Sequence, residues 1–212
     1  MKTMVAVPCM DQVPARFAHS LAALQRVGDT SVAFQIGSLI YTSRNELARR
    51  AVEDEADYVF WLDSDMVFEP DALQKLMKHI EAGKDMVTGL YFRRVPPFSP
   101  VLFRHLDINE ERAIWSEFET IPDELFKVEG CGFGCVLMRT EIFMDVASRF
   151  GDMFGPLNGV GEDLSFCWRA KQCGFEIWCD PSVEMGHVGY TMINRSFFNN
   201  FRKAQDLREA RV

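Results

Sequence analysis

Apolar positions in the first 92 residues follow two alternating patterns, which predict strands and helices in turn. Short and almost continuous apolar runs cover residues 5–8, 31–36, 58–62 and 85–91, as in strands that are buried on both faces. Between these runs, apolar residues recur every three or four positions, as in amphipathic helices. Strands that alternate with helices predict an α/β fold with a mostly parallel sheet flanked by helices.

Residues at the ends of these segments predict the helix boundaries. Ser43 and Glu46 have the spacing of a capping box, which predicts a helix that begins at Ser43. Pro14 and Pro70 suit the first turn of a helix, and Pro70 is predicted to occupy the first helical position. Gly83 is predicted to end the helix that follows Pro70.

The second half of the chain has a looser pattern. Residues 93–126 contain four of the nine prolines and no sustained period, which predicts an elaborated loop with a short hairpin near 113–118. Residues 128–139 predict one strand, with close backbone approach at Gly130, Gly132 and Gly134. Further predicted elements are a helix capped by Thr140, a helix over 161–173, a strand over 175–179 that turns at Asp180 and Pro181, and a terminal helix over 194–211.

Composition narrows the class of protein. The 212 residues carry a net charge of −8, which argues against a broad nucleic-acid-binding surface. We find no secretory signal and no apolar run near 18 residues, and we therefore expect a cytoplasmic protein without a transmembrane helix. The six cysteines form no CxxC pair, so reduced, buried cysteines are expected rather than a zinc site. Without repeats or linkers, residues 1–212 are predicted to form one domain.

The strand over 58–62 ends at Asp63-Ser64-Asp65, where two carboxylates lie one residue apart. The period of a strand places both on the same side of the chain, at the sheet edge where α/β proteins bind ligands. A divalent cation such as Mg²⁺ or Mn²⁺ would relieve their repulsion and could also bind a diphosphate. The alternative interpretation is that both acids only stabilise the start of the next helix.

Other polar residues follow helix starts and strand ends. Glu162 and Asp163 begin a helix and suit either the positive helix end or a general base for an acceptor hydroxyl. His187, between two glycines, is a candidate third metal ligand, although a lone histidine is often only hydrogen-bonded. Arg44 could contact ribose or diphosphate, or lie in a solvated first turn with Asn45. Arg93 and Arg94 could serve the cleft or be surface residues only.

An ordered set of motifs resembles GT-A-type nucleotide-sugar glycosyltransferases, especially the compact family-two-like members. These motifs are Val7-Pro8, Ser43-Arg44-Asn45-Glu46-Leu47-Ala48, Phe60-Trp61-Leu62-Asp63-Ser64-Asp65-Met66, Thr88-Gly89-Leu90-Tyr91, Gly132-Phe133-Gly134-Cys135 and Gly161-Glu162-Asp163. The resemblance covers nearly the whole chain. It implies a GT-A fold with a nucleotide-binding half over 1–92, an acceptor half over 93–193 and a terminal helix over 194–212.

The resemblance also implies roles for individual residues. The donor would be a UDP- or GDP-sugar bound by Pro8, Arg44, Asn45, Asp63, Ser64 and Asp65. Asp63, Asp65 and His187 would hold Mn²⁺ or Mg²⁺, Asp163 would be the base of an inverting reaction, and Glu162 would orient acceptor or donor. Many relatives have an acid after the second strand that reads the nucleobase, whereas this chain has Phe34-Gln35-Ile36-Gly37. The nucleobase, the stereochemistry and the acceptor therefore stay open.

Two other functions compete with this interpretation. Asp63-Ser64-Asp65-Met66-Val67 also matches the nucleophile motif of haloacid-dehalogenase-type phosphatases, but no suitable acid follows Gly151-Asp152. The motif of those enzymes also normally follows the first strand, not the third. The terminal helix combines phenylalanines with Arg195, Arg202 and Lys203, so a non-catalytic protein that contacts membranes through residues 194–212 is the second alternative.

Overall fold

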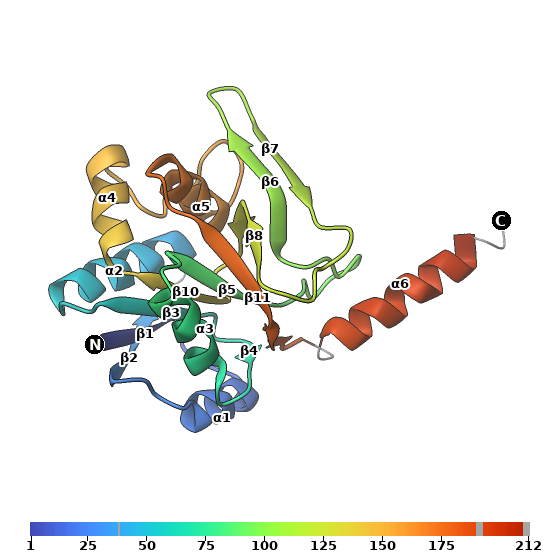
Figure 1. Cartoon of the computed structure of the whole chain (residues 1–212), viewed down its shortest axis with the longest axis horizontal. Helices are drawn as coiled ribbons and strands as arrows, with labels where there is room; N and C mark the ends of the chain where they lie inside the picture. The colour runs from blue at the N-terminus through green and yellow to red at the C-terminus, as the bar shows by residue number, and fades with distance from the viewer. Residues whose placement is uncertain (38, 190–192, 210–212) are drawn as a thin grey trace.

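The computed structural model describes residues 1–37, 39–189 and 193–209. A sheet forms the middle layer of the molecule, with α2, α4 and α5 on one face and α1 and α3 on the other (Figure 1). The helices are α1 (Ala15–Ala23), α2 (Ile40–Glu53), α3 (Ala72–Glu81), α4 (Glu141–Phe150), α5 (Glu162–Gln172) and α6 (Arg195–Glu209). Among the described residues, none of these helices has the length and apolar character needed to cross a membrane.

The central sheet has seven strands in the order β2-β1-β3-β10-β5-β11-β8. Five of them run in one direction, while β10 and β8 run antiparallel to their neighbours. The predicted mostly parallel, helix-flanked sheet is therefore confirmed. The strands are β1 (Lys2–Cys9), β2 (Asp29–Ile36), β3 (Tyr58–Leu62), β5 (Met86–Leu90), β8 (Phe126–Val128), β10 (Cys135–Arg139) and β11 (Ile177–Glu184).

Alternate residues of each central strand enter opposite cores. In β3, Val59 and Trp61 pack with α2, α4 and α5, whereas Phe60 and Leu62 pack with α1 and α3. All four side chains are fully buried. A strand covered on both faces exposes neither set of side chains to water, and this explains the unbroken apolar run over residues 58–62. The strand ends where the covered part of the sheet ends, and Asp63 follows at the open edge.

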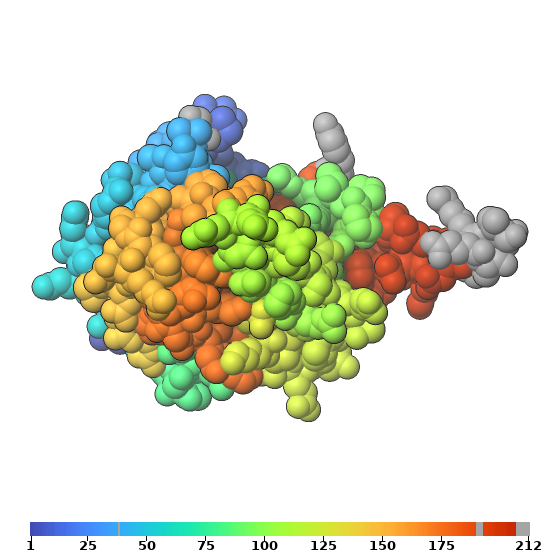
Figure 2. Space-filling view, turned by 90° about the horizontal axis from the view of Figure 1, so that it is seen from above, coloured from blue at the N-terminus to red at the C-terminus, as the bar shows by residue number. Residues whose placement is uncertain are grey.

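Two smaller sheets extend this framework. One joins β6 (Leu102–Ile108) to β7 (Ala113–Glu117) and β9 (Gly130–Cys131), and the other joins β4 (Met66–Val67) to β12 (Gly186–His187). Figure 2 shows the tip of the β6–β7 hairpin, in yellow-green, over the orange surface of the α5 region. The pairing of β12 with β4 sets His187 opposite Met66, close to the acids that follow β3.

The terminal helix α6 extends away from the sheet (Figure 1). Its first turns are attached by aromatic contacts: Phe198 stacks on Phe92 at a ring distance of 5.0 Å, and Phe197 and Phe201 both meet Phe98 at 4.8 Å. The helix was predicted over 194–211, and its last two predicted residues lie outside the described part of the chain.

Several predicted boundaries are wrong. Ser43 is not a helix cap, because α2 begins three residues earlier at Ile40 and the Ser43 amide already donates to the Leu39 carbonyl. Pro70 lies two residues before α3, whose N-cap is Asp71. These errors share a cause: a cap pattern is local, while packing on the sheet decides where the helix begins.

The predictions for the second half also need correction. The segment 93–126 contains the strand β6, which the prolines obscured, besides the hairpin partner expected near 113–118. Residues 128–139 contain the end of β8 and the short strands β9 and β10 instead of one strand, since the chain leaves the central sheet, joins the sheet of β6 and β7 and then returns. Asp180 and Pro181 do not end a strand; β11 continues to Glu184 with an irregular register after Asp180.

Candidate active site

A cavity of about 430 Å³ opens beyond the carboxyl ends of β1 and β3. Its lining contains all but one of the predicted site residues, although they come from segments far apart in the chain. These lining residues are Pro8, Cys9, Met10, Gly37, Ile40, Arg44, Asp63, Ser64, Asp65, Tyr91, Arg94, Phe133, Glu162, Asp163 and His187. This is the edge at which open α/β sheets bind ligands.

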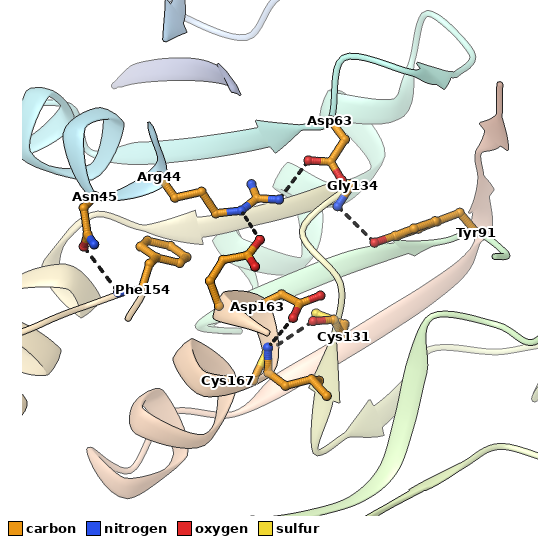
Figure 3. A network of polar contacts seen from close by, with 11 residues as sticks. Arg44, Asn45, Asp63, Tyr91, Cys131, Gly134, Phe154, Asp163 and Cys167 are labelled. Atoms are coloured by element: carbon orange, nitrogen blue, oxygen red, sulfur yellow. Dashed lines mark hydrogen bonds and ion pairs between the residues drawn. The ribbon is translucent and has the colours of Figure 1, made fainter. Parts of the chain in front are cut away.

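Arg44 connects two of the predicted acids. Its side chain reaches from α2 to Asp63, with Nη2 2.8 Å from Oδ1 (Figure 3). Its Nε lies 3.1 Å from Oε1 of Glu162. The residue is only 2% exposed, and its guanidinium group lies 5.5 Å from the ring of Trp61 and 5.3 Å from that of Phe133. Burial alone would lower the pKa of Arg44, but the charges of Asp63 and Glu162 raise it on balance.

Asn45 is the predicted site residue that lies outside the cavity lining. Its amide nitrogen donates to Oδ1 of Asp152 at 3.1 Å, and its Oδ1 accepts from the backbone amide of Phe154 at 3.3 Å. Phe154 is fully buried and stacks on Phe166 of α5 at 4.5 Å. In this structure Asn45 therefore joins α2 to the segment that leads into α5.

Asp65 meets two basic side chains at one oxygen. Its Oδ2 lies 2.8 Å from Nη1 of Arg94 and 3.4 Å from Nε2 of His187. Burial alone would raise the pKa of Asp65, but the hydrogen bond and charge of His187 and the charge of Arg94 lower it on balance. Nδ1 of His187 lies 2.9 Å from the carbonyl oxygen of Phe92, and because a carbonyl can only accept, Nδ1 donates there and the ring is held with Nε2 toward Asp65.

These atoms can be compared with the needs of a divalent ion. Among residues 1–37, 39–189 and 193–209, no group of three or more His, Cys, Asp and Glu side chains could hold a metal. Asp63 lines the cavity, but its Oδ1 is bound by Arg44. The oxygen of Asp65 and the nitrogen of His187 are 3.4 Å apart, close to the separation of about 3 Å expected for neighbouring ligands of Mg²⁺.

The net charge of the lining agrees with a divalent ion. The cavity walls carry four carboxylates and two guanidinium groups, which leaves −2 when His187 is neutral. Mg²⁺ commonly uses one or two protein carboxylates and completes its shell with water and substrate phosphates. The residues present fit such a site with Asp65 and His187 as the protein ligands that already face each other.

Asp163 has an unusual environment at the start of α5. Burial and, to a smaller extent, the charge of Glu162 raise the pKa of its carboxyl group to about 6, although the hydrogen bond from the Leu164 amide and the charge of Arg44 oppose the shift. The Leu164 amide donates to Oδ1 of Asp163 at 2.7 Å. A carboxylate with a pKa near the operating pH suits proton transfer.

A second cavity of about 450 Å³ shares five residues with the first. The shared residues are Asp63, Tyr91, Arg94, Asp163 and His187. Beyond them, the second cavity extends along Arg93, Val95, Val101, Phe103 and Leu164. Asp163 thus lies between two spaces, one on the β1 side and the other beside β6.

Tyr91 is a site residue that the sequence reasoning did not assign. It is buried where β5 ends, and its hydroxyl oxygen accepts a hydrogen bond from the Gly134 amide at 3.0 Å (Figure 3). A Cβ atom at Gly132 would overlap the hydroxyl group, and one at Gly134 would lie 2.9 Å from the ring. The close approach predicted for these glycines is confirmed, and their proximity to Tyr91 is its reason.

The model of the family described as "Glycosyl transferase family 2" matches residues 34–147, which is more than half of the chain. Among solved structures, A197 from STIV superposes with a TM-score of 0.63 and 18% identity over 89% of this chain and 86% of that chain. GalNAc-T7, whose crystal structure contains UDP, GalNAc and Mn²⁺, gives a TM-score of 0.61 at 10% identity. That match covers 89% of this chain and 44% of GalNAc-T7, so this chain spans less than half of that protein.

The α/β sheet, the helical layers and the acidic cavity at the sheet edge define a GT-A-type nucleotide-sugar transferase, and both structural similarities support this fold. The chain belongs to glycosyl transferase family 2, and it is therefore a glycosyltransferase that uses a nucleotide sugar. The alternative assignment to haloacid-dehalogenase-type phosphatases is wrong, since the family match includes Asp63-Ser64-Asp65 and the motif follows β3 rather than β1.

Proposed function

We propose that this enzyme transfers a sugar from UDP or GDP to an acceptor hydroxyl with inversion, in a reaction that depends on a divalent ion and uses Asp163 as base. The observation that carries the proposal is that Asp163 lines both cavities and shares the first of them with the pair formed by Asp65 and His187. Donor and acceptor would then approach this carboxylate from different sides.

The larger part of the donor fits the cavity on the β1 side. Its far end is formed by Pro8, Cys9 and Gly37, together with the exposed apolar side chains of Met10 and Ile40. Such a surface can cover the face of a nucleobase but offers no carboxylate to distinguish one base from another. UDP and GDP are therefore both included in the experiments below.

The residues around the diphosphate would bind and position the donor before the bond between sugar and diphosphate breaks. Asp65 and His187 would hold Mg²⁺ or Mn²⁺. A bound ion would neutralise the negative charge on the departing diphosphate. Arg44 keeps Asp63 and Glu162 in place, because both acids bind its buried guanidinium group. Ser64 lies between the two acids in the lining and is proposed as a further donor contact.

Asp163 would then accept the proton of the acceptor hydroxyl while that oxygen attacks the sugar. Its pKa of about 6 leaves it mostly ionised at pH 7, yet keeps it a stronger base than an ordinary aspartate. Glu162 is proposed to orient the acceptor or donor, since it lines the first cavity next to Asp163 and is fixed by Arg44.

The donor site is tested by thermal unfolding with UDP and GDP, and with their sugars, each with and without Mn²⁺. A ligand at 100 times its dissociation constant stabilises by about 2.7 kcal/mol, which is about 5–10 °C in Tm for a chain of this size. Asp65→Ala should abolish the Mn²⁺-dependent part of this shift. Asp71→Ala, which removes an acid at the start of α3 outside the cavity, should retain it. A full shift in Asp65→Ala would contradict the metal assignment.

The base assignment is tested by Asp163→Asn. The variant should bind the nucleotide with Mn²⁺ as the native enzyme does, while turnover of the donor falls by about 100-fold or more. Unimpaired turnover would refute the role of Asp163. NMR of the anomeric proton in the first product would establish whether the configuration is inverted.

Membrane contact through residues 194–212 stays a prediction. The phenylalanines at the start of α6 pack on Phe92 and Phe98, so this part of the apolar face is already used within the molecule. Sedimentation with anionic liposomes, with and without residues 194–212, measures any lipid contact of this helix.

A further inference from the structure

Arg94 lies at the point where the two cavities meet. It follows β5 by four residues, it lines both cavities, and its side chain is 50% exposed. Its Nη1 lies 2.8 Å from Oδ2 of Asp65 and 3.4 Å from the carbonyl oxygen of Val188. The neighbouring Arg93 turns elsewhere and binds Glu117 at 2.8 Å.

The atom of Asp65 that Arg94 occupies is the same oxygen that faces Nε2 of His187. Two cations cannot share this oxygen at short range without strong repulsion. Arg94 must therefore leave Asp65 before the carboxylate and His187 can bind a divalent ion together. In the structure as it stands, the guanidinium group supplies the positive charge at this position.

We propose that Arg94 competes with the divalent ion for Asp65, and that the diphosphate of the donor relieves this competition by giving Arg94 a new anionic partner. The inference builds on the metal site of the proposed function. Its consequence is that metal and nucleotide bind cooperatively: the ion alone binds weakly, and the nucleotide strengthens its binding by freeing Asp65. Coupling between two ligands is reciprocal, so the ion strengthens nucleotide binding by the same factor.

The exposure of Arg94 sets the size of the effect. An ion pair that is half exposed contributes little, and its removal should tighten Mn²⁺ binding by about two- to fivefold. Arg94 needs no rearrangement of a strand or helix to move, because it lies in the loop between β5 and β6. A residue that only bound the diphosphate would leave the affinity for Mn²⁺ alone unchanged or lower it.

The test measures free Mn²⁺ by electron paramagnetic resonance during titration of the full chain, first without nucleotide and then with saturating UDP or GDP. The variants are Arg94→Gln, the matched control Arg93→Gln and the site control Asp65→Ala. Without nucleotide, Arg94→Gln should bind Mn²⁺ about two- to fivefold more tightly than the native chain, while Arg93→Gln should not differ. Addition of the nucleotide should strengthen Mn²⁺ binding less in Arg94→Gln than in the native chain.

Equal or weaker Mn²⁺ binding by Arg94→Gln, with Asp65→Ala still defective, would overturn the competition and leave the metal site intact. Equal binding by all four proteins would instead overturn the metal site and the competition with it. Tighter binding by Arg93→Gln to the same degree would show a general charge effect and would also overturn the specific role of Arg94.

Discussion

Replacement of Asp163 by asparagine should stabilise the folded enzyme at neutral pH. The carboxyl group has a pKa of about 6 in the folded chain against an ordinary value of 3.8, a difference of about two pH units. At about 1.4 kcal/mol for each pH unit, ionisation of Asp163 costs the folded state about 3 kcal/mol. Asparagine retains an oxygen that can accept the hydrogen bond from the Leu164 amide but carries no charge.

The sign of the pH dependence follows from the raised pKa. Below about pH 3 the group is protonated in both the folded and the unfolded state, so the native chain and the variant should be equally stable. As the pH rises from about 3 to about 6, the unfolded state loses its proton first, and the native chain becomes progressively less stable than Asp163→Asn. Above pH 7 the difference should reach its full value of about 3 kcal/mol, or about 6–12 °C in Tm.

Thermal unfolding of both proteins between pH 4.5 and pH 8 measures this difference. The expected gap is about 1 kcal/mol at pH 4.5 and about 3 kcal/mol at pH 7.5. Glu141→Gln is the control, since Glu141 is an exposed acid in the first turn of α4 and its removal should change stability by less than about 1 kcal/mol. A gap that is absent at pH 7.5, or equally large at both pH values, would refute the buried and destabilised carboxylate.

Three further substitutions test other parts of the site. Arg44→Leu should lower the free energy of unfolding by about 3 kcal/mol, because its two acidic partners lose their buried cation; an unchanged Tm would contradict this. Gly132→Ala should lower the free energy of unfolding by about 1–3 kcal/mol by forcing Tyr91 to move, and by less in a Tyr91→Phe background. Equal losses in the two backgrounds, measured by denaturant unfolding, would exclude the hydroxyl group as the cause. Asp180→Asn should lower Tm at pH 7 more than at pH 3.5. Burial alone would raise the pKa of Asp180, but hydrogen bonds from Ser182, through its side chain and its amide, and from His79 lower it on balance. That stabilisation disappears as the carboxylate is protonated. A loss independent of pH would point to packing instead.

The sequence predicted the layered α/β fold because the burial of each strand and helix determines the pattern of apolar residues along it. Helices cover both faces of the sheet, so every residue from Val59 to Leu62 contacts one of the two cores and is apolar. This produces a continuous apolar run in the sequence. The same apolar run predicted the position of the acids, since Asp63 directly follows the last residue of β3 that the helices bury. The turn predicted at Asp180 is wrong. A strand can contain a proline where its pairing register becomes irregular, and this irregularity is visible only in the pairing of β11 with β5.

What the sequence alone determined was therefore the order of strands and helices, the two apolar faces of the sheet and the residue types that reach its open edge. Only the tertiary structure decided which groups meet there. It inserted β10 antiparallel between β3 and β5, brought Arg44 to Glu162 across 118 positions of the chain, and set Arg94 against Asp65. The physical reason is that periodicity reflects whether each residue is buried, whereas ion pairs and proton affinities depend on distances between segments that no local pattern records.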